Sequence, residues 1–332
     1  MTNPDPHPDE VALSPGDQSC GVEVLGPREV PLGGPRAMTV RRTLPSRQRS
    51  LVGAWCFVDH YGPDDVAESG GMKVAPHPHT GLQTVSWLFS GEIEHRDSAG
   101  HHAMVRPGEL NLMTAGRGIS HSEVSTAATG TLHGAQLWVA LPDGARDGEP
   151  AFEHHVPDPV SGDGWEARVF LGSLLGVTSP VTTHTPLLGA ELLLAPGAVI
   201  DLEVDATFEH AVLLDRGAAR VEGTDAAAGD LVYAAPGRTT LRLEAGGDAG
   251  RLLVLGGPPF GEEIVMWWNF VGRTHEEVVA FRAQWQDQIT RDGEVVDDSQ
   301  DVAPGRYGVV VGDRLAPIPA PELPNARLRT RS

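Results

Sequence analysis

The sequence predicts an all-β protein made of two tandem β-barrels of the jelly-roll type, with one short helix near the C-terminal end. The 332 residues include 40 glycines and 27 prolines, which suits many short strands joined by turns. Short apolar stretches alternate with turn residues through both halves of the chain. A weak internal repeat relates the halves, because Pro107-Gly-Glu109 and Ala228-Gly-Asp230 each precede a similar apolar stretch.

The first half is predicted to form a run of short strands. Residues 83–89 alternate, with Val85, Trp87 and Phe89 on one face, and the Ser90-Gly91 pair that follows predicts a hairpin turn. Further strands, separated by turns that contain glycine, are predicted over residues 92–96, 103–105, 110–113, 119–124 and 134–141.

The second half repeats this pattern and ends in a helix. Its strands are predicted over residues 190–194, 199–204, 210–214, 218–222 and 231–235. Thr274 is a good N-cap, and Glu277 three residues later completes a capping box. The apolar side chains that then recur at helical spacing are Val278, Phe281, Trp285 and Ile289.

Composition divides the chain into five parts. Residues 1–20 are polar and rich in proline, and they are predicted to be disordered. The remaining parts are the first barrel at 21–141, a linker rich in proline and glycine at 142–164, the second barrel with its helix at 165–290, and an extended proline-rich tail at 291–332.

Net charge and cysteine content indicate which binding partners and which cellular compartment to expect. A net charge of −20 disfavours binding to nucleic acid or to an anionic membrane. Cys20 and Cys56 are too few for a disulfide framework and suit a reducing cytosol. The first residues lack the features of a signal peptide, and no apolar run is long enough for a membrane helix. We therefore expect a cytoplasmic protein.

Two short motifs supply candidate metal ligands. Side chains two residues apart in a strand point to the same face, so His77 and His79 can aim at one point, as can His121 and Glu123. If the two strands meet inside one barrel, the four side chains form a set of three imidazoles and one carboxylate. That set suits one divalent first-row ion: Fe(II), Ni, Mn, Cu, Zn or Co. Pro78 favours an edge strand or a barrel mouth, where small-molecule sites occur.

Each motif also has a simpler interpretation. His77 and His79 could be surface residues of a loop, and Ser122 could point inward, which would leave His121 and Glu123 in solvent. No nucleophile elbow, phosphate-binding loop or zinc knuckle competes with the metal hypothesis.

The other histidines are assigned ordinary roles. His95, His101 and His102 are predicted on a solvated face, His60 in a turn with a structural hydrogen bond, and His133 as a candidate to line the barrel. The histidines without a paired ligand partner are His154, His155, His184, His210 and His275. Residues 239–242 match the position of the second motif but carry no such pair, so the second barrel is predicted to be metal-free.

Five segments together resemble the pirin family of the cupin superfamily. They are Pro76-His-Pro-His-Thr-Gly81, Ser90-Gly-Glu-Ile-Glu-His95, Pro107-Gly-Glu-Leu110, Met113-Thr-Ala-Gly-Arg-Gly-Ile-Ser-His-Ser-Glu123 and Gln136-Leu-Trp-Val139. The resemblance covers residues 21–288. It implies a bicupin with a metal, usually iron, in the first barrel only.

The resemblance also implies which residues bind that metal. The implied ligands are His77, His79, His121 and Glu123, the same four that the spacing selects. Many pirins have a glutamate four residues after the second histidine, where this chain has Gln83. An amide cannot act as a base, so we expect the metal to remain while the contacts with a substrate change.

The resemblance implies a dioxygenase of the quercetin 2,3-dioxygenase type, which cleaves a flavonol ring with O2. Glu123 would take the proton of the 3-hydroxyl group, and Gln83, Gln136 and Trp138 are the candidate substrate contacts. The alternative is a non-enzymatic, redox-sensitive iron protein that regulates a transcription factor or a metabolic enzyme. A third possibility is a structural protein without turnover.

Overall fold

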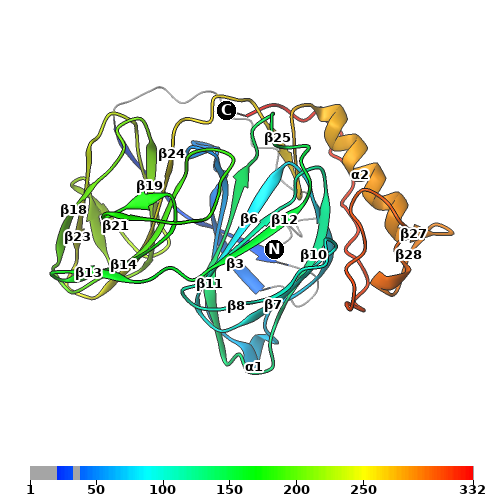
Figure 1. Ribbon diagram of the computed structural model, residues 1–332, viewed down its shortest axis with the longest axis horizontal. Coiled ribbons are helices and arrows are strands. Elements are labelled where there is room, and N and C mark those ends of the chain that lie inside the picture. The colour runs from blue at the N-terminus through cyan, green and yellow to red at the C-terminus, as the bar shows by residue number, and fades with distance from the viewer. Residues whose placement is uncertain (1–20, 33–37, 332) are drawn as a thin grey trace.

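The computed structural model describes residues 21–32 and 38–331. Two β-barrels lie side by side, and the 15-residue helix α2 (His275–Ile289) lies at the far edge of the first barrel (Figure 1). This confirms the predicted all-β bicupin with a short C-terminal helix. The predicted disorder of residues 1–20, and with it Cys20, lies outside the described residues.

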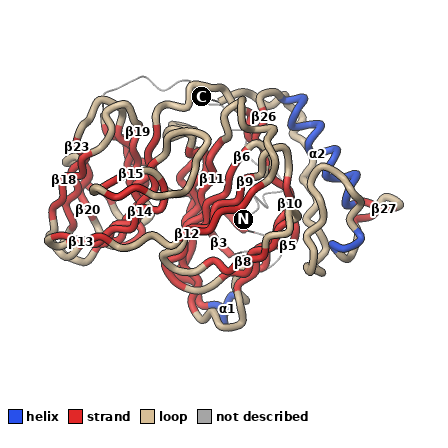
Figure 2. Tube along the Cα trace, viewed as in Figure 1, coloured by secondary structure: helices blue, strands red, loops and turns tan. Residues whose placement is uncertain are grey.

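The first barrel consists of two facing sheets (Figure 2). The seven-stranded sheet contains, in spatial order, β12 (Ala151–His155), β9 (Leu110–Thr114), β6 (Leu82–Ser90), β11 (Thr131–Ala140), β4 (Trp55–Asp65), β3 (Met38–Leu44) and β2 (Arg28–Leu32). The four-stranded sheet contains β5 (Lys73–His79), β10 (Ile119–Ser125), β7 (Ile93–Asp97) and β8 (His102–Val105). A short helix, α1 (Val66–Ser69), follows β4.

The second barrel has the same plan. Its seven-stranded sheet contains β1 (Val22–Leu25), β22 (Leu231–Ala234), β19 (Glu209–Arg216), β24 (Gly250–Gly257), β17 (Leu188–Leu194), β14 (Trp165–Leu171) and β13 (Val160–Gly162). Its four-stranded sheet contains β18 (Val199–Glu203), β23 (Thr240–Ala245), β20 (Ala219–Val221) and β21 (Thr224–Ala226). A small hairpin joins β15 (Ser173–Leu174) to β16 (Val177–Thr178).

Strand pairing alters two of the predicted boundaries. Residues 142–164 are not a bare linker, because β12 pairs with β9 in the first barrel and β13 pairs with β14 in the second. The first strand, β1, was assigned to the first barrel but pairs with β22 of the second. In both cases the extra strand satisfies backbone groups of a sheet edge, which composition alone does not reveal.

The two barrels share one apolar core. The face of β6 that carries Val85 and Trp87 packs against the second barrel, where Trp87 stacks on Phe170 with ring centroids 4.5 Å apart. Leu213 and Leu253 of the second barrel belong to the same buried cluster. The barrels are therefore joined by a hydrophobic interface of the kind found inside a single domain.

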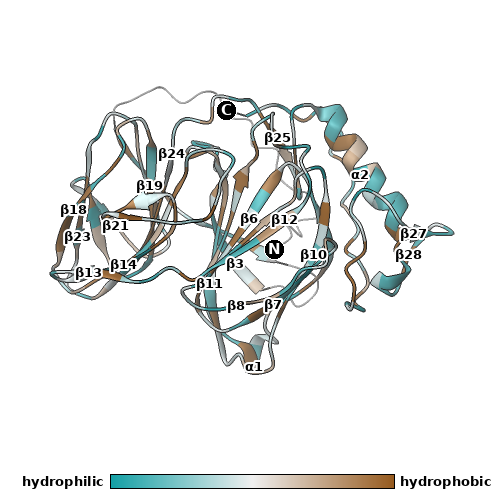
Figure 3. Cartoon of the chain, in the orientation of Figure 1, coloured by the Kyte–Doolittle hydropathy of each residue, from teal (hydrophilic) through white to brown (hydrophobic). Residues whose placement is uncertain are grey.

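The C-terminal segment, residues 265–331, returns to the first barrel rather than staying with the second. It comprises β25 (Val265–Trp267), β26 (Phe270–Gly272), α2 (His275–Ile289), β27 (Thr290–Arg291), β28 (Glu294–Val295) and a 3₁₀ turn at Ser299–Asp301. Thr274 caps α2 by accepting a hydrogen bond from the Glu277 amide, as predicted. Figure 3 shows α2 and the β27–β28 hairpin as largely hydrophilic, and the side chains that α2 buries include the predicted four.

The predicted domain division groups this helix with the second barrel, whereas the hydrogen bonds of the segment that carries it reach the first barrel. Val271 donates a backbone hydrogen bond to Thr80, and Ile318 donates one to Pro76. The tail after residue 290 is only partly the extended surface strand that was predicted, since Tyr307 is fully buried. These contacts cover β5, the edge strand that carries His77 and His79. Within the described ranges, no helix combines the length and apolarity needed to cross a bilayer.

Candidate metal centre

The two histidine motifs lie on neighbouring antiparallel strands. In the register of β5 and β10, His121 lies opposite His77, and Ile119 lies opposite His79. The pairing is irregular between His121 and Glu123, which is typical of a β-bulge. Such a bulge changes the direction of a side chain, and here it follows His121 directly.

The three imidazoles of this centre face one another inside the first barrel. One ring nitrogen each of His77, His79 and His121 lies within 4.8 Å of the other two. The ring centroids are 4.4 Å apart for His77 and His121, 4.9 Å for His79 and His121, and 5.0 Å for His77 and His79. All three side chains are fully buried.

Each of these imidazoles has a ring nitrogen that is available to a metal. Among the described residues, the Nε2 atoms of His77, His79 and His121 have no hydrogen-bond partner. His77 uses its other nitrogen, Nδ1, to contact the Ala75 carbonyl at 2.9 Å, which fixes the ring as in many metal sites. Buried polar atoms without a partner are costly, so three of them aimed at one place fit a bound cation.

The protonation state of the imidazoles also suits ligation. Burial lowers the pKa of His77 to about 3. The pKa values of His79 and His121 also lie well below the usual value, because of burial first and the neighbouring histidines second. At neutral pH all three rings are therefore neutral, which is the form that binds a transition metal.

Glu123 lies close to His121. It is buried, and it forms a second close group with His121 and His95 whose ligand atoms all lie within 4.8 Å of one another. Its Oε1 accepts a hydrogen bond from the Ser86 hydroxyl at 3.2 Å. His121 thus belongs to both groups, whereas Glu123 is grouped with His121 and His95 and not with His77 and His79.

His95 is a member of the centre that the sequence interpretation missed. It was predicted on a solvated face, but its side chain is only 4% exposed, and its Nδ1 lies 3.3 Å from Nδ1 of His121. Its Nε2 lies 3.4 Å from Asp97, which also contacts His101. The prediction is wrong because Ile93, His95 and Asp97 alternate as the inward face of β7, a period-two pattern that was visible in the sequence.

Two of the three predicted substrate contacts lie near the centre. The Ser86 hydroxyl oxygen lies 2.8 Å from Gln136 Oε1 and 3.2 Å from Glu123 Oε1, and its single proton can be donated to one of these two acceptors at a time. The ring of Trp138 meets the ring of His79 edge to face, with centroids 5.1 Å apart, and stacks on Phe57 at 4.0 Å.

Gln83, the third predicted contact, is not brought to the imidazoles. Because side chains alternate along a strand, Gln83 lies on the face of β6 that carries Val85 and Trp87, and Ser86 lies on the other face. Nε2 of Gln83 donates to the Thr114 hydroxyl at 2.8 Å. The exchange of an acid for an amide at this position therefore affects strand packing rather than the centre.

Tyr61 adds a hydroxyl group that no sequence motif indicates. Burial, and then the charge of Glu123, raise the pKa of Tyr61 well above its usual value. Its hydroxyl has no hydrogen-bond partner within the described part of the chain. A neutral buried phenol beside a carboxylate can donate a hydrogen bond to a bound molecule.

His60 and His133 lie outside this centre. His60 was predicted in a turn but lies within β4, where its predicted structural hydrogen bond is formed with Asp215. His133 lies on β11 beside it. Both side chains face the second barrel, from which Asp215 comes.

His210 of the second barrel gives a pH-dependent prediction. Burial lowers its pKa from 6.5 to about 4, and neither ring nitrogen has a partner among the described residues. The unfolded chain binds a proton below pH 6.5, whereas the folded protein does so only near pH 4, so this residue makes stability fall as the pH drops between these values. The loss attributable to His210 is about 3 kcal/mol in total.

The His210→Leu variant should therefore lose less stability than the wild type between pH 6.5 and 4. The measurement is the free energy of unfolding across this range, with exposed His184→Leu as the control. A difference between His210→Leu and wild type that stays constant with pH would contradict the assignment.

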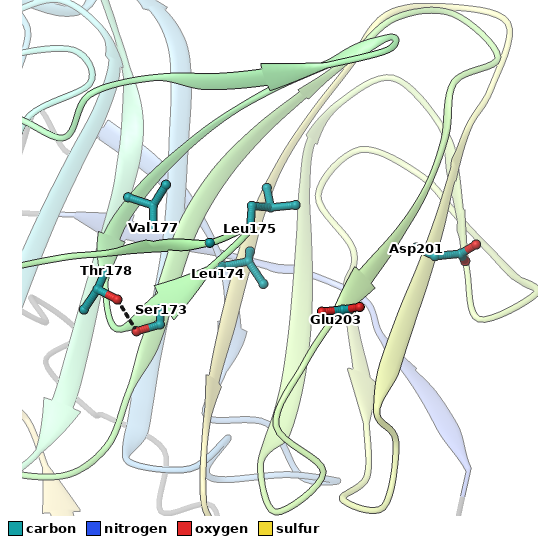
Figure 4. Close-up of a pocket in the computed structure, with 8 residues that line it drawn as sticks. Ser173, Leu174, Leu175, Val177, Thr178, Asp201 and Glu203 are labelled. Carbon is teal, nitrogen blue, oxygen red and sulfur yellow. Dashed lines mark hydrogen bonds between the residues drawn. The ribbon is translucent and has the colours of Figure 1, made fainter.

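A surface pocket of about 530 Å³ lies elsewhere, on the second barrel (Figure 4). Residues 173–178 line it together with Asp201 and Glu203, and Ser173 and Thr178 share a hydrogen bond of 2.8 Å across the β15–β16 hairpin. None of its lining residues carries an imidazole. It is not part of the metal centre.

Comparison with known proteins places these features in a family. The "Pirin" family model matches residues 37–139, and the "Pirin C-terminal cupin domain" model matches residues 189–290. A protein of Pseudomonas aeruginosa, named as a candidate quercetin 2,3-dioxygenase, is 42% identical over 295 residues, which is 89% of each chain.

Two solved structures are similar to this chain. The crystal structure of quercetin 2,3-dioxygenase from Acinetobacter baumannii is 37% identical, with a TM-score of 0.83 over 93% of this chain and 97% of that one. A bacterial pirin from Escherichia coli, solved in complex with nickel(II), shares the fold at 18% identity and a TM-score of 0.56, over 72% of this chain and all of that one.

Proposed function

Because this chain belongs to the pirin family, as both matched domains and its relatives show, we propose that it is a metal-dependent dioxygenase of the quercetin 2,3-dioxygenase type. The observation that carries the proposal is the group of three buried, neutral imidazoles whose Nε2 atoms lack other partners. The substrate class is an aromatic molecule like a flavonol, with O2 as the second reactant. The names of the Pseudomonas and Acinetobacter relatives support this choice.

We propose that His77, His79, His121 and Glu123 hold one divalent ion, Fe(II) first among the candidates. The donor set of imidazoles and a carboxylate suits iron, nickel and other first-row ions. The nickel complex of the Escherichia coli pirin shows that a protein of this fold binds such an ion. When bound, the ion would act as a Lewis acid that stabilises the deprotonated 3-hydroxyl oxygen of the flavonol.

Glu123 is the proposed base for that 3-hydroxyl proton. The Ser86 hydroxyl lies between Glu123 Oε1 and Gln136 Oε1, so the two side chains are held together across the barrel interior. A carboxylate positioned in this way can accept a proton from a substrate hydroxyl within hydrogen-bond reach. The Tyr61 hydroxyl can donate a hydrogen bond to the charge that remains.

The surroundings of the centre keep water away from it. Trp138 and Phe57 stack on each other beside His79 and make this flank of the centre apolar. Both rings are buried, as are the three imidazoles. A dry site strengthens the electrostatic interactions and protects a reactive anion from unwanted protonation.

The test of this function combines metal loading with turnover. The protein is stripped of metal, reloaded with Fe(II) or Ni(II) without oxygen, and then given quercetin and O2. We expect consumption of O2 with release of carbon monoxide, which His77→Ala should abolish and Glu123→Gln should strongly reduce. The exposed His102→Ala on β8 is the matched control and should keep full activity. Stoichiometric metal without turnover would overturn the enzymatic proposal and favour the regulatory alternative.

His95 offers a second, quantitative prediction. As the partner of His121 Nδ1 it orients that ring, and loss of such a partner typically weakens metal binding by roughly 10–100-fold. His95→Phe keeps an aromatic ring against Phe152, whose centroid lies 5.0 Å away, but removes the contact of the ring nitrogen with His121. Metal affinity measured by competition with a chelator should fall by that factor, and an unchanged affinity would exclude a positioning role.

A further inference from the structure

A second group of potential ligands lies where the two barrels meet. His60 comes from β4 and His133 from β11 of the first barrel, while Asp215 comes from β19 of the second. The side chains of His60 and Asp215 are essentially buried, and that of His133 is 12% exposed. This group shares no residue with the imidazole centre of the first barrel.

Three potential ligand atoms of this group converge on one point. Oδ1 of Asp215 lies 2.7 Å from Nε2 of His60 and 2.5 Å from Nε2 of His133. The two Nε2 atoms are 3.3 Å apart. Donors that surround a tetrahedral zinc ion at its usual bond lengths lie about 3.3 Å from one another. The nitrogen pair already has that spacing, and the two shorter contacts require the carboxylate to move by less than about 1 Å.

Hydrogen bonds alone do not satisfy these atoms. A neutral imidazole nitrogen carries either one proton or one lone pair, and so serves one kind of partner. Nε2 of His60 nevertheless faces an acceptor in Asp215, a donor in Arg41 Nη2 at 3.4 Å, and the equivalent nitrogen of His133. If both imidazoles are protonated on Nε2 toward Asp215, their two protons crowd each other at this distance.

The neighbouring arginines leave Oδ1 to the imidazoles. Arg251 contacts the other carboxylate oxygen, Oδ2, at 3.3 Å, and its Nε lies 3.4 Å from Glu191. Arg41 donates to the Gly62 carbonyl at 2.5 Å. Carboxylates that bind a metal through one oxygen are commonly hydrogen-bonded through the other, and here Arg251 is that second partner.

We propose that His60 Nε2, His133 Nε2 and Asp215 Oδ1 form a second metal site, which binds a divalent ion of the zinc class and links the two barrels. The two imidazoles bind as neutral rings with the proton on Nδ1, and Asp215 supplies the negative charge. The partly exposed side of His133 leaves the fourth position to water. The site is independent of the proposed dioxygenase activity, because its ligands lie outside the catalytic centre.

The test counts zinc in four forms of the full chain: wild type, His77→Gln, His133→Gln and the double variant. Each is dialysed against the same chelator-buffered zinc. Glutamine at 133 can still donate to Asp215, so it keeps the hydrogen bond of the metal-free form but is a poor ligand. We expect His133→Gln to bind one zinc fewer per chain than wild type. The double variant should likewise bind one zinc fewer than His77→Gln, so the result does not depend on binding at the first centre. Exposed His184→Gln is the control and should bind as much as wild type.

A melting experiment keeps the proposal testable if the count is ambiguous. Zinc should raise the melting temperature of His77→Gln but not that of the double variant, since an ion that binds only the folded form stabilises it. Equal zinc counts with and without His133→Gln, or an equal zinc effect on both melting temperatures, would overturn the proposal.

Discussion

Replacing His121 with alanine is expected to abolish binding of the ion that we propose for the first barrel, and with it all metal-dependent turnover. His121 is the one residue that belongs to both close ligand groups, the first with His77 and His79 and the second with His95 and Glu123. Its replacement by alanine removes a potential ligand from both groups at once. Affinity should fall by more than the roughly 10–100-fold that the loss of an outer partner costs.

The measurement is metal per chain by elemental analysis, together with O2 uptake in the presence of quercetin. His102→Ala is again the control, because His102 is exposed on the neighbouring β8. A His121→Ala protein that keeps one ion per chain would show that the ion is bound elsewhere. Circular dichroism should show the same strand content as wild type, so that loss of metal is not confused with unfolding.

Phe170→Ala is expected to destabilise the whole protein, by about 3–5 kcal/mol. Phe170 is completely buried and stacks on Trp87 across the junction of the two barrels. Truncating it leaves a cavity in the cluster that both barrels share. Since the two barrels share this core, both should unfold in one transition, and Phe170→Ala should move the midpoint of that single transition.

Denaturant unfolding followed by tryptophan fluorescence measures this effect. Val199→Ala is a suitable control, because Val199 is 47% exposed, and it should change stability by no more than about 0.5 kcal/mol. Two separate transitions in the wild type, with only one of them moved by Phe170→Ala, would show that the barrels are independent folding units.

Local patterns in the sequence were enough to predict many of the strands and to select candidate ligands that prove to be buried. Period-two alternation identified β6, and the spacing of His77 with His79 and of His121 with Glu123 selected residues that the register of β5 and β10 brings together. The N-cap at Thr274 was equally local. These features depend only on residues close together in the chain, where side-chain direction follows from strand or helix geometry.

Contacts between distant parts of the chain were not predicted. Nothing near β1 indicates that it pairs with β22, more than two hundred residues later. The position of α2 on the first barrel depends on backbone hydrogen bonds to Thr80 and Pro76, which leave no trace in composition. His60, His133 and Asp215 meet only because the barrels pack through one core. Such pairings are set by the global packing rather than by local preference.

The C-terminal segment has a consequence for how this protein is made. A nascent chain that has just completed its second barrel still has β5 as a bare sheet edge, because Ile318 and Tyr307 have not yet left the ribosome to reach Pro76 and Ser120. Capture of the proposed ion should therefore come last in biosynthesis, and chains that terminate early should emerge without it.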